Sequence, residues 1–390
     1  CHVVHIFTRH SDRRAPGKTC RTTLTHSELQ LNKTLIAAAL LAGFAGAAQA
    51  QSNVTLYGIA DAGFVSSKND GQRATNGIDS GYAGGSRWGI RGSEDLGNGL
   101  KANFQLESGI NIDQGTTGQS LGTTSRLFGR TAWVGLQSTS LGELRLGRQD
   151  SFAFGWFGSS INPFGNAYGQ AQSQTIFGFN ATGGTGDRLD NTALYMTPVF
   201  AGFQAGIGYS FNAAGAEATV ASGAARTDQR VITSGLRYNN GPLAVVFTYD
   251  QRNAPDSAAA AASSDIKNYQ LGATYDFGVV KAHAGYGRLQ NYAFRSASEK
   301  ENAYLLGLSV PFGAHALLAT YQRLDNRNKN LGREDNNIDG FAIAYNYKLS
   351  KRTMVYAAAS QYSDSVQYTG AAATRTGDRR ELGFGIQHRF

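Results

Sequence analysis

Cysteine, proline and long apolar runs are scarce in this chain. Its only two cysteines, Cys1 and Cys20, both precede a segment that the sequence predicts to be removed on export. The remaining chain can form neither a disulfide nor a thiolate metal site, so a large packed or hydrogen-bonded framework must hold it together. Proline contributes only 6 of the 390 residues, which suits long uninterrupted hydrogen-bond ladders.

The first fifty residues contain the longest apolar run. Lys33 precedes apolar residues 35–46, and Ala48, Gln49 and Ala50 follow as a small-x-small cleavage site. This order predicts a signal peptide over residues 31–50, cut before Gln51. Residues 1–30 have no role in such a precursor, and we expect them to be an over-extended reading frame whose true start lies at or near Leu31.

Removal of residues 1–50 also lowers the positive charge. Six basic and two acidic residues lie there, so the net charge falls from +8 to +4. A positive surplus of this size, spread over residues 51–390, is a weak argument for nucleic-acid binding, and no nucleic-acid partner is expected. After Gln51 no stretch approaches the roughly 20 apolar residues of a membrane-spanning helix.

Charged residues and histidine are absent from residues 151–186. Aromatic residues recur throughout this stretch, but Gly, Asn, Gln, Ser and Thr interrupt them every few positions, which is typical of neither a core helix nor a membrane helix. The pattern predicts one long, neutral, aromatic-rich loop.

Alternation with period two is the commonest pattern after Asn53. It is clear around residues 54–64, 100–110, 203–211, 243–249 and 341–347, where apolar and polar side chains take turns. Such segments are strands with one apolar and one polar face.

Seven tight-turn signals punctuate these strands, and they predict sixteen strands in total. Neighbouring signals lie 35 to 43 residues apart, except for one interval of 60 residues that contains the neutral loop. The signals stand at residues 97–99, 141–142, 201–202, 239–242, 276–278, 311–313 and 348–352.

Long and short connections therefore alternate along the chain. A soluble sandwich or propeller would place the polar face outside and keep the loops short at both edges, so the alternation disfavours both. Short turns on one side and long loops on the other are typical of a 16-stranded antiparallel transmembrane β-barrel. Aromatic residues near both strand ends fit two interfacial girdles.

The last strand ends on an aromatic residue, with Phe384, Ile386 and Phe390 on its apolar face. It resembles the terminal signal strand of Gram-negative outer-membrane proteins. Over residues 51–390 the chain is similar to the general porins of β- and γ-proteobacteria, most of all to the β-proteobacterial branch. The resemblance rests on the order and spacing of residues 54–58 (VTLYG), 86–92 (SRWGIRG), 130–136 (RTAWVGL), 146–149 (LGRQ), 195–198 (YMTP) and 385–390 (GIQHRF).

The resemblance implies a homotrimer in the bacterial outer membrane, in contact with lipid and lipopolysaccharide. It also implies that the C-terminal strand is read by the barrel-assembly machinery, and that the third long loop, residues 151–186, folds into the lumen. Enteric relatives carry a carboxylate on this loop. The corresponding piece here has none; it comprises Asn162, Pro163, Phe164, Gly165 and Asn166.

A wall of basic residues facing this loop is predicted in part from the rule that successive side chains of a strand point to opposite faces, which we call strand parity. Trp88 and Ile90 share a face that suits lipid, so Arg87 and Arg91 are predicted to face the lumen. An arginine on the lipid side at mid-membrane would cost about 2–4 kcal/mol, which decides the assignment.

Three further arginines complete the predicted wall. Arg130 and Arg188 match wall positions in the family, and Arg148 is an additional candidate. Parity is less clean for Arg130, because both Trp133 and the set around Val134 suit lipid. A positive wall with no opposing carboxylate would favour small anions over cations. The alternative is that these arginines pair with Asp150, Asp187 or Asp190, or lie among headgroups.

Other functions have weaker support. An enzyme would need a nucleophile or water-activating constellation, and after Gln51 the chain has only three histidines, His283, His315 and His388. It also shows no phosphate loop, zinc spacing or dinucleotide fingerprint, so neither an enzyme nor a cofactor is expected. A channel specific for phosphate or organic anions stays open beside a general porin. Basic clusters around residues 323–333 and 375–380 are expected to be solvated loop charge, with lipopolysaccharide contact as the alternative.

Overall fold

The computed structural model describes residues 53–121, 123–165, 167–168, 188–217, 228–253, 265–290, 300–326, 338–369 and 372–390. The expected reading-frame extension (1–30), the signal peptide (31–50), Asn166, residues 169–187 and the basic segment 327–333 lie outside these ranges. Within the described ranges we find no helix whose length and apolarity would let it cross a membrane.

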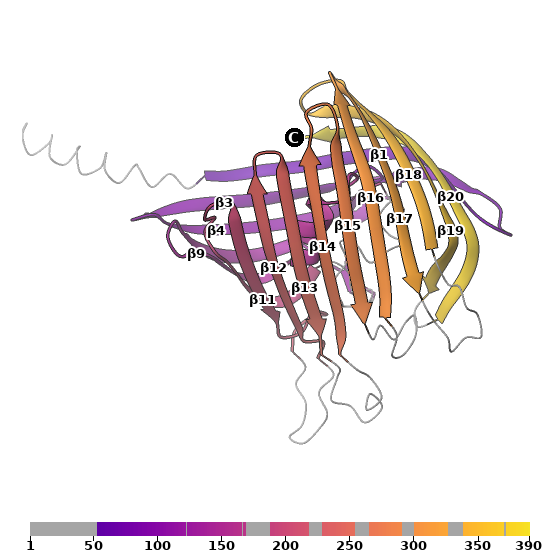
Figure 1. The fold of residues 1–390 in the computed structure, drawn as a ribbon. Helices are drawn as coiled ribbons and strands as arrows, with labels where there is room; N and C mark the ends of the chain where they lie inside the picture. The colour runs from indigo at the N-terminus through magenta and orange to yellow at the C-terminus, as the bar shows by residue number, and fades with distance from the viewer. Residues whose placement is uncertain are drawn as a thin grey trace, which may run out of the picture. The chain divides into compact units, whose positions relative to one another are not determined.

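Sixteen strands of the described chain form one closed antiparallel barrel (Figure 1). In chain order they are β1 (Asn53–Asn69), β3 (Arg87–Gly97), β4 (Leu100–Asn111), β8 (Thr131–Ser138), β9 (Gly142–Asp150), β10 (Arg188–Met196), β11 (Phe203–Ser210), β12 (Val231–Asn240), β13 (Leu243–Arg252), β14 (Ile266–Asp276), β15 (Lys281–Gln290), β16 (Lys300–Phe312), β17 (His315–Asn326), β18 (Ile338–Lys348), β19 (Thr353–Thr369) and β20 (Ala372–Arg389).

Five short elements lie outside this series. The strand β2 (Thr75–Ser80) pairs with β1 on the same side as β3, and β5 (Thr116–Thr117) pairs with β4. The strands β6 (Ser120–Leu121) and β7 (Thr124–Ser125) pair with each other, and a π-helix, η1 (Ala153–Gly158), follows β9.

The barrel closes between its first and last strands. β1 pairs with β20 from Ile59↔Arg389 to Asn69↔Arg379, and with β3 on its other side. The backbones of Gly58 and Phe390 add two hydrogen bonds of 3.1 Å each. Closure leaves no strand edge unpaired, which is required of any sheet that lies in hydrocarbon. The predicted sixteen-stranded barrel is thus confirmed.

All seven predicted short turns join neighbouring strands. The turn between β3 and β4 shows why these residues form it, because Asn98 (φ 52°) and Gly99 (φ 75°) adopt the left-handed conformation. Glycine adopts this conformation without strain, and asparagine tolerates it better than most residues.

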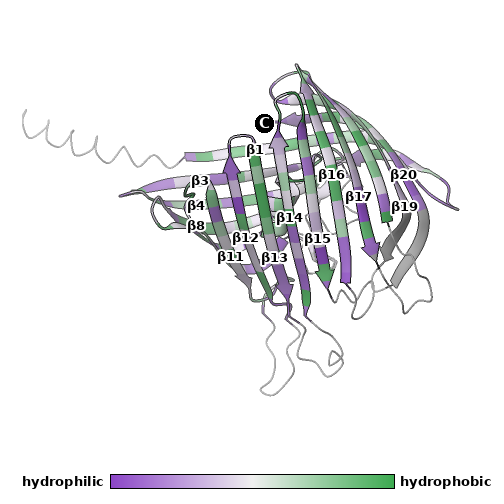
Figure 2. Cartoon of the chain, in the orientation of Figure 1, coloured by the Kyte–Doolittle hydropathy of each residue, from purple (hydrophilic) through white to green (hydrophobic). Residues whose placement is uncertain are grey.

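The two faces of the sheet differ in polarity, as the alternation predicts. In β13 the side chains of Thr248 and Asp250 are buried, whereas Phe247, directly before Thr248, is 40% exposed. The same holds around the barrel, where apolar residues such as Leu306 and Ile343 are exposed on the outer face. Figure 2 shows green apolar positions alternating with purple polar ones along the strands. An exposed apolar outer face is unfavourable in water and favourable in lipid.

Asp61 holds the closing seam together from the inner face. Its side chain is completely buried and accepts hydrogen bonds from the Tyr356 hydroxyl on β19 (2.8 Å) and from Gln387 Nε2 on β20 (2.9 Å). Its backbone N–H donates to Ser86 Oγ (3.0 Å), and Ser86 Oγ donates back to its carbonyl (2.8 Å). One carboxylate on β1 therefore links the two last strands.

We expect the variant Asp61→Ala to destabilise the barrel, because it leaves two buried donors without an acceptor. Each orphaned donor costs about 1–3 kcal/mol, so the urea midpoint of the purified protein in lipid vesicles should fall clearly. Tyr356→Phe, which removes one bond and orphans no donor, should lose only about 1 kcal/mol. An unchanged midpoint for Asp61→Ala would show that the seam does not depend on this carboxylate.

Candidate functional site

The first half of the neutral loop packs on the polar face of the sheet. Phe157 and Ile161 are completely buried, and Phe152, Phe164 and Tyr168 are nearly so. These aromatic side chains therefore pack against the barrel wall.

Four strand glycines make room for this segment. A β-carbon added at Gly206 would lie 2.2 Å from the Phe152 ring, and one at Gly235 would lie 2.8 Å from Trp156. At Gly272 it would lie 2.5 Å from Ile161. At Gly307 it would lie 2.4 Å from Pro163. The missing side chains on β11, β12, β14 and β16 thus form a bed for residues 152–163.

Polar contacts fix the segment at several points around the barrel. The backbone N–H of Phe152 donates to Thr233 Oγ1 on β12 (3.0 Å), and Nδ1 of His283 on β15 lies 2.8 Å from the carbonyl oxygen of Ile161. The Tyr168 hydroxyl donates to Asn346 Oδ1 on β18 (2.5 Å). The segment therefore bridges strands from β12 to β18.

Tyr168 also joins an aromatic cluster beside the closing seam. Its ring lies 6.2 Å from that of Tyr82, 5.9 Å from that of Tyr356 and 5.3 Å from that of Phe164, all edge-on. Asn162 forms the tight turn before this cluster, with its Oδ1 accepting from the Phe164 N–H (3.0 Å) and its carbonyl accepting from the Gly165 N–H (2.8 Å).

A cavity of about 990 Å³ lies between this segment and strands on opposite sides of the barrel. Its lining includes six arginine and lysine side chains against three acidic ones, Glu107, Glu143 and Asp150. The six basic residues are Arg87, Arg130, Arg145, Arg237, Lys281 and Arg389.

Arg87 and Arg130, both predicted from sequence, line this cavity and share one carboxylate. Glu107 Oε1 lies 2.6 Å from Arg130 Nε and 3.8 Å from Arg87 Nη1, and its Oε2 accepts from the Tyr57 hydroxyl (2.9 Å). The alternation of polar and apolar residues in β4 places Glu107 on the polar face. This pattern could have identified Glu107 from the sequence as a residue that faces the cavity. The cavity therefore contains a carboxylate that the expectation of an unopposed basic wall left out.

Arg130 lies inside despite strand parity. In β8, Val134 is 58% exposed and Trp133 lines the cavity, so strict alternation from Trp133 would turn residue 130 outward. Arg130 precedes the first residue of β8, Thr131, and is free of that alternation. Its backbone N–H donates to the carbonyl of Glu107 (3.1 Å).

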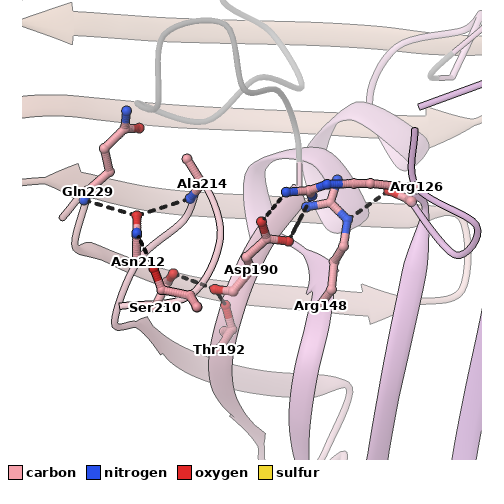
Figure 3. Close-up of polar contacts among 10 residues, drawn as sticks. Arg126, Arg148, Asp190, Thr192, Ser210, Asn212, Ala214 and Gln229 are labelled. Carbon is pink, nitrogen blue, oxygen red and sulfur yellow. Dashed lines mark hydrogen bonds and ion pairs between the residues drawn. The ribbon is translucent and has the colours of Figure 1, made fainter. Parts of the chain in front are cut away.

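Arg148 and Arg188 lie outside the cavity lining, each in an ion pair. Arg148 Nη1 lies 2.5 Å from Asp190 Oδ1, and Arg126 Nη2 lies 2.6 Å from Asp190 Oδ2, so two arginines again share one carboxylate (Figure 3). Arg188 Nε lies 3.1 Å from Asp150 Oδ1. Its guanidinium group stacks 4.7 Å from the Phe154 ring.

Arg91 is exposed and stands apart from the cavity. Its guanidinium carbon lies 5.2 Å from the Tyr57 ring centre, and no ion pair reaches it among the described residues. On the outer face of β20, Phe384 and Ile386 are about half exposed, and so is Phe390 directly after the strand.

Two cavity arginines that the wall prediction did not include stack on tryptophans. Arg145 lies 4.3 Å from the Trp133 ring centre, with Nη2 2.8 Å from Glu143 Oε2. Arg237 lies 4.5 Å from the Trp156 ring centre. Both occupy inner positions of their strands, so a search of every polar face for basic residues would have found them.

A closed barrel with an apolar exterior and a polar, charged cavity defines an outer-membrane channel. The chain belongs to the Gram-negative porin family, whose model matches residues 37–367. An outer membrane porin protein of Bordetella pertussis is 41% identical over 92% of this chain and 100% of its own length. Outer membrane porin protein 32 of Delftia acidovorans is 34% identical over 84% of this chain and 88% of its own length.

A solved porin structure has the same fold. The anion-selective porin from Comamonas acidovorans superposes with a TM-score of 0.69 at 28% identity, covering 87% of this chain and all of that one. The protein is therefore an outer-membrane porin and a channel rather than an enzyme.

Trp156 offers a direct probe of the glycine bed. In a Trp88→Phe, Trp133→Phe background, where Trp156 is the only remaining tryptophan, we expect Gly235→Val to displace the indole from its buried position. Its fluorescence should shift to longer wavelength, and acrylamide should quench it more strongly. Gly77→Val, at a glycine with open space around it, is the control and should change neither signal. Equal quenching in both variants would mean that Gly235 does not seat the segment.

Proposed function

We propose that this porin forms a water-filled path for passive diffusion of small hydrophilic solutes, with a preference for anions. The excess of six basic over three acidic side chains in the cavity lining carries the proposal. Surplus positive charge in a low-dielectric passage lowers the entry barrier for anions and raises it for cations. The 28% identical Comamonas acidovorans porin, described as anion-selective, supports it.

Residues 151–186 are proposed to narrow this path by folding into the lumen. The support comes from the described half, whose side chains pack on the polar face of β11, β12, β14 and β16 and whose Asn162, Pro163, Phe164 and Gly165 line the cavity. On this proposal Arg87 and Arg130 border the narrow part of the path. Arg91, Arg148 and Arg188 are the remaining members of the proposed wall and lie outside the cavity lining, with Arg148 paired to Asp190 and Arg188 to Asp150.

Charge selectivity is measured directly in a planar bilayer under a potassium chloride gradient. We expect a reversal potential of the sign that marks chloride as the more permeant ion, with ohmic current over a range of salt concentrations. A reversal potential of cation-selective sign would refute the anion preference. Saturable block by phosphate or one organic anion at low concentration would instead indicate a solute-specific channel of the same fold.

We also propose how the protein is exported and assembled, following the pattern that the porin resemblance implies. We propose that the signal peptide is cut before Gln51, that the barrel-assembly machinery reads the strand ending at Phe390, and that three copies associate. A hollow of about 960 Å³, whose lining includes exposed apolar residues such as Leu306 and Phe341 together with Lys68 and Arg380, supports contact with the acyl chains and phosphates of lipopolysaccharide.

Native mass spectrometry of protein extracted in mild detergent tests these points together. We expect a trimer of chains that begin at Gln51, with part of the population carrying lipopolysaccharide. Phe390→Ala should lower the yield of this species, whereas Phe312→Ala, at an exposed aromatic next to a short turn, should not. A monomer, a chain that retains residues 31–50, or an unaffected yield would each refute the corresponding step.

A further inference from the structure

A short segment between β2 and β3 leaves the barrel wall. β1 pairs with β2 through Ser80 and with β3 from Arg87 onward, so residues 81–86 lie outside both ladders. Where the segment begins, the N–H of Gly81 donates to the carbonyl of Asp61 (2.9 Å), and Gly81 adopts the left-handed conformation (φ 72°) that glycine tolerates. We call residues 81–86 the inner segment.

The inner segment faces the cavity. Ala83 and Gly84 belong to the cavity lining, and Tyr82 is only 6% exposed. A β-carbon added at Gly383 on β20 would lie 2.5 Å from the Tyr82 ring. Gly383 shares its strand face with Gln387, which also lines the cavity, so the Tyr82 ring packs on the inner face of the wall.

The inner segment also contacts the basic wall. Arg87 Nε donates to the carbonyl oxygen of Gly85 (2.9 Å), and a β-carbon at Gly85 would lie 3.2 Å from Arg130 Nη1. A β-carbon at Gly84 would lie 2.7 Å from Gln387 Nε2. The absence of side chains at positions 84 and 85 therefore lets this backbone lie close to the wall side chains.

Tyr82 joins the inner segment to the neutral loop. Its ring lies edge-on to the Tyr168 ring (6.2 Å) and stacks on the Tyr356 ring of β19 (6.1 Å). Tyr168 is in turn edge-on to Tyr356 (5.9 Å), so the three rings contact one another. Aromatic pairs at such distances are favourable beyond the area that they bury. We call Tyr82, Tyr168 and Tyr356 the tyrosine clamp.

Tyr168 occupies the clamp at a cost to its backbone. Its φ of 59° lies in the left-handed region, which residues other than glycine rarely adopt. The side chain is nevertheless 4% exposed, and its hydroxyl donates to Asn346 Oδ1 (2.5 Å). The ring contacts and this hydrogen bond outweigh the strain, so the position of this part of the loop depends on them.

We infer that the tyrosine clamp holds the neutral loop against the inner segment and thereby sets the largest neutral solute that the channel admits. The inference rests on the proposed function, in which residues 151–186 narrow the path. Tyr82 and Tyr168 are then positioning residues, because they fix the loop relative to the inner segment that contacts Arg87. The clamp is uncharged, so its loss should change the size limit and keep the sign of the charge selectivity.

Swelling of proteoliposomes in isotonic sugar solutions measures the size limit. The rate in the trisaccharide raffinose is divided by the rate in arabinose. We expect Tyr82→Ala to raise this ratio by about threefold and Tyr168→Ala by about tenfold, because the second variant also loses its contact with Tyr356 and its bond to Asn346. Tyr304→Ala, at a tyrosine of β16 that is 43% exposed, is the control and should leave the ratio unchanged.

Two further variants distinguish the clamp from a general loosening of the barrel. If Tyr82 acts on the loop through Tyr168, adding Tyr82→Ala to Tyr168→Ala should raise the ratio by less than about 1.5-fold. A further rise as large as that of Tyr82→Ala alone would show independent effects and overturn the inference. Tyr168→Phe keeps all three rings and should raise the ratio less than Tyr168→Ala, and an equal rise would likewise overturn it.

The outcomes separate the inference from the proposed function. If the unmodified protein passes raffinose as fast as arabinose, the path is not narrowed and the proposed function fails. If the unmodified protein excludes raffinose but neither alanine variant raises the ratio, the inference alone is overturned. Should Tyr82→Ala fail to fold, Tyr82→Leu fills part of the same space without an aromatic ring. It should raise the ratio in the same direction, and an unchanged ratio would again overturn the inference.

Discussion

The hydrogen bonds between β1 and β20 are the interaction on which the rest of the structure depends. A sheet with an open edge would leave rows of unpaired backbone groups in hydrocarbon, which no side-chain arrangement could compensate. Pairing from Ile59↔Arg389 to Asn69↔Arg379 removes that edge. Because Asp61 lies in the same seam and accepts from both β19 and β20, the closure is fixed by side chains as well as by the backbone.

Closure also decides where polar residues and the neutral loop can go. Once the apolar face meets lipid, the polar face of the strands has to line the interior, and a segment that packs there needs both apolar side chains and room. Glycines at positions 206, 235, 272 and 307 give that room, while Phe152, Phe157 and Ile161 fill it. The lack of charge in this stretch follows, since a buried charge against these surfaces would need a partner.

Sequence alone predicted the architecture because its signals are local. Alternation with period two assigns each face, and turn residues such as Asn98 and Gly99 mark each short connection. Which side chains form ion pairs depends on contacts between strands, and these contacts cannot be read from the order of residues in the sequence. Glu107 meets Arg130 across a long connection, and Arg130 departs from parity because it stands just before β8. Arg237 stacks on a tryptophan of the loop far away in sequence, so its role required the structure.

Shared carboxylates tie the long connections to the barrel wall. Arg126 connects the stretch between β7 and β8 to the start of β10 through Asp190, which also pairs with Arg148, so one carboxylate joins the long connection before β8 to the strand that begins where the neutral loop ends. Glu107 likewise pairs with Arg130, which directly precedes β8, and with Arg87, the first residue of β3. Each of these two carboxylates holds two arginines and offsets only one of their two charges, so the pairing that fixes the wall still leaves it positive.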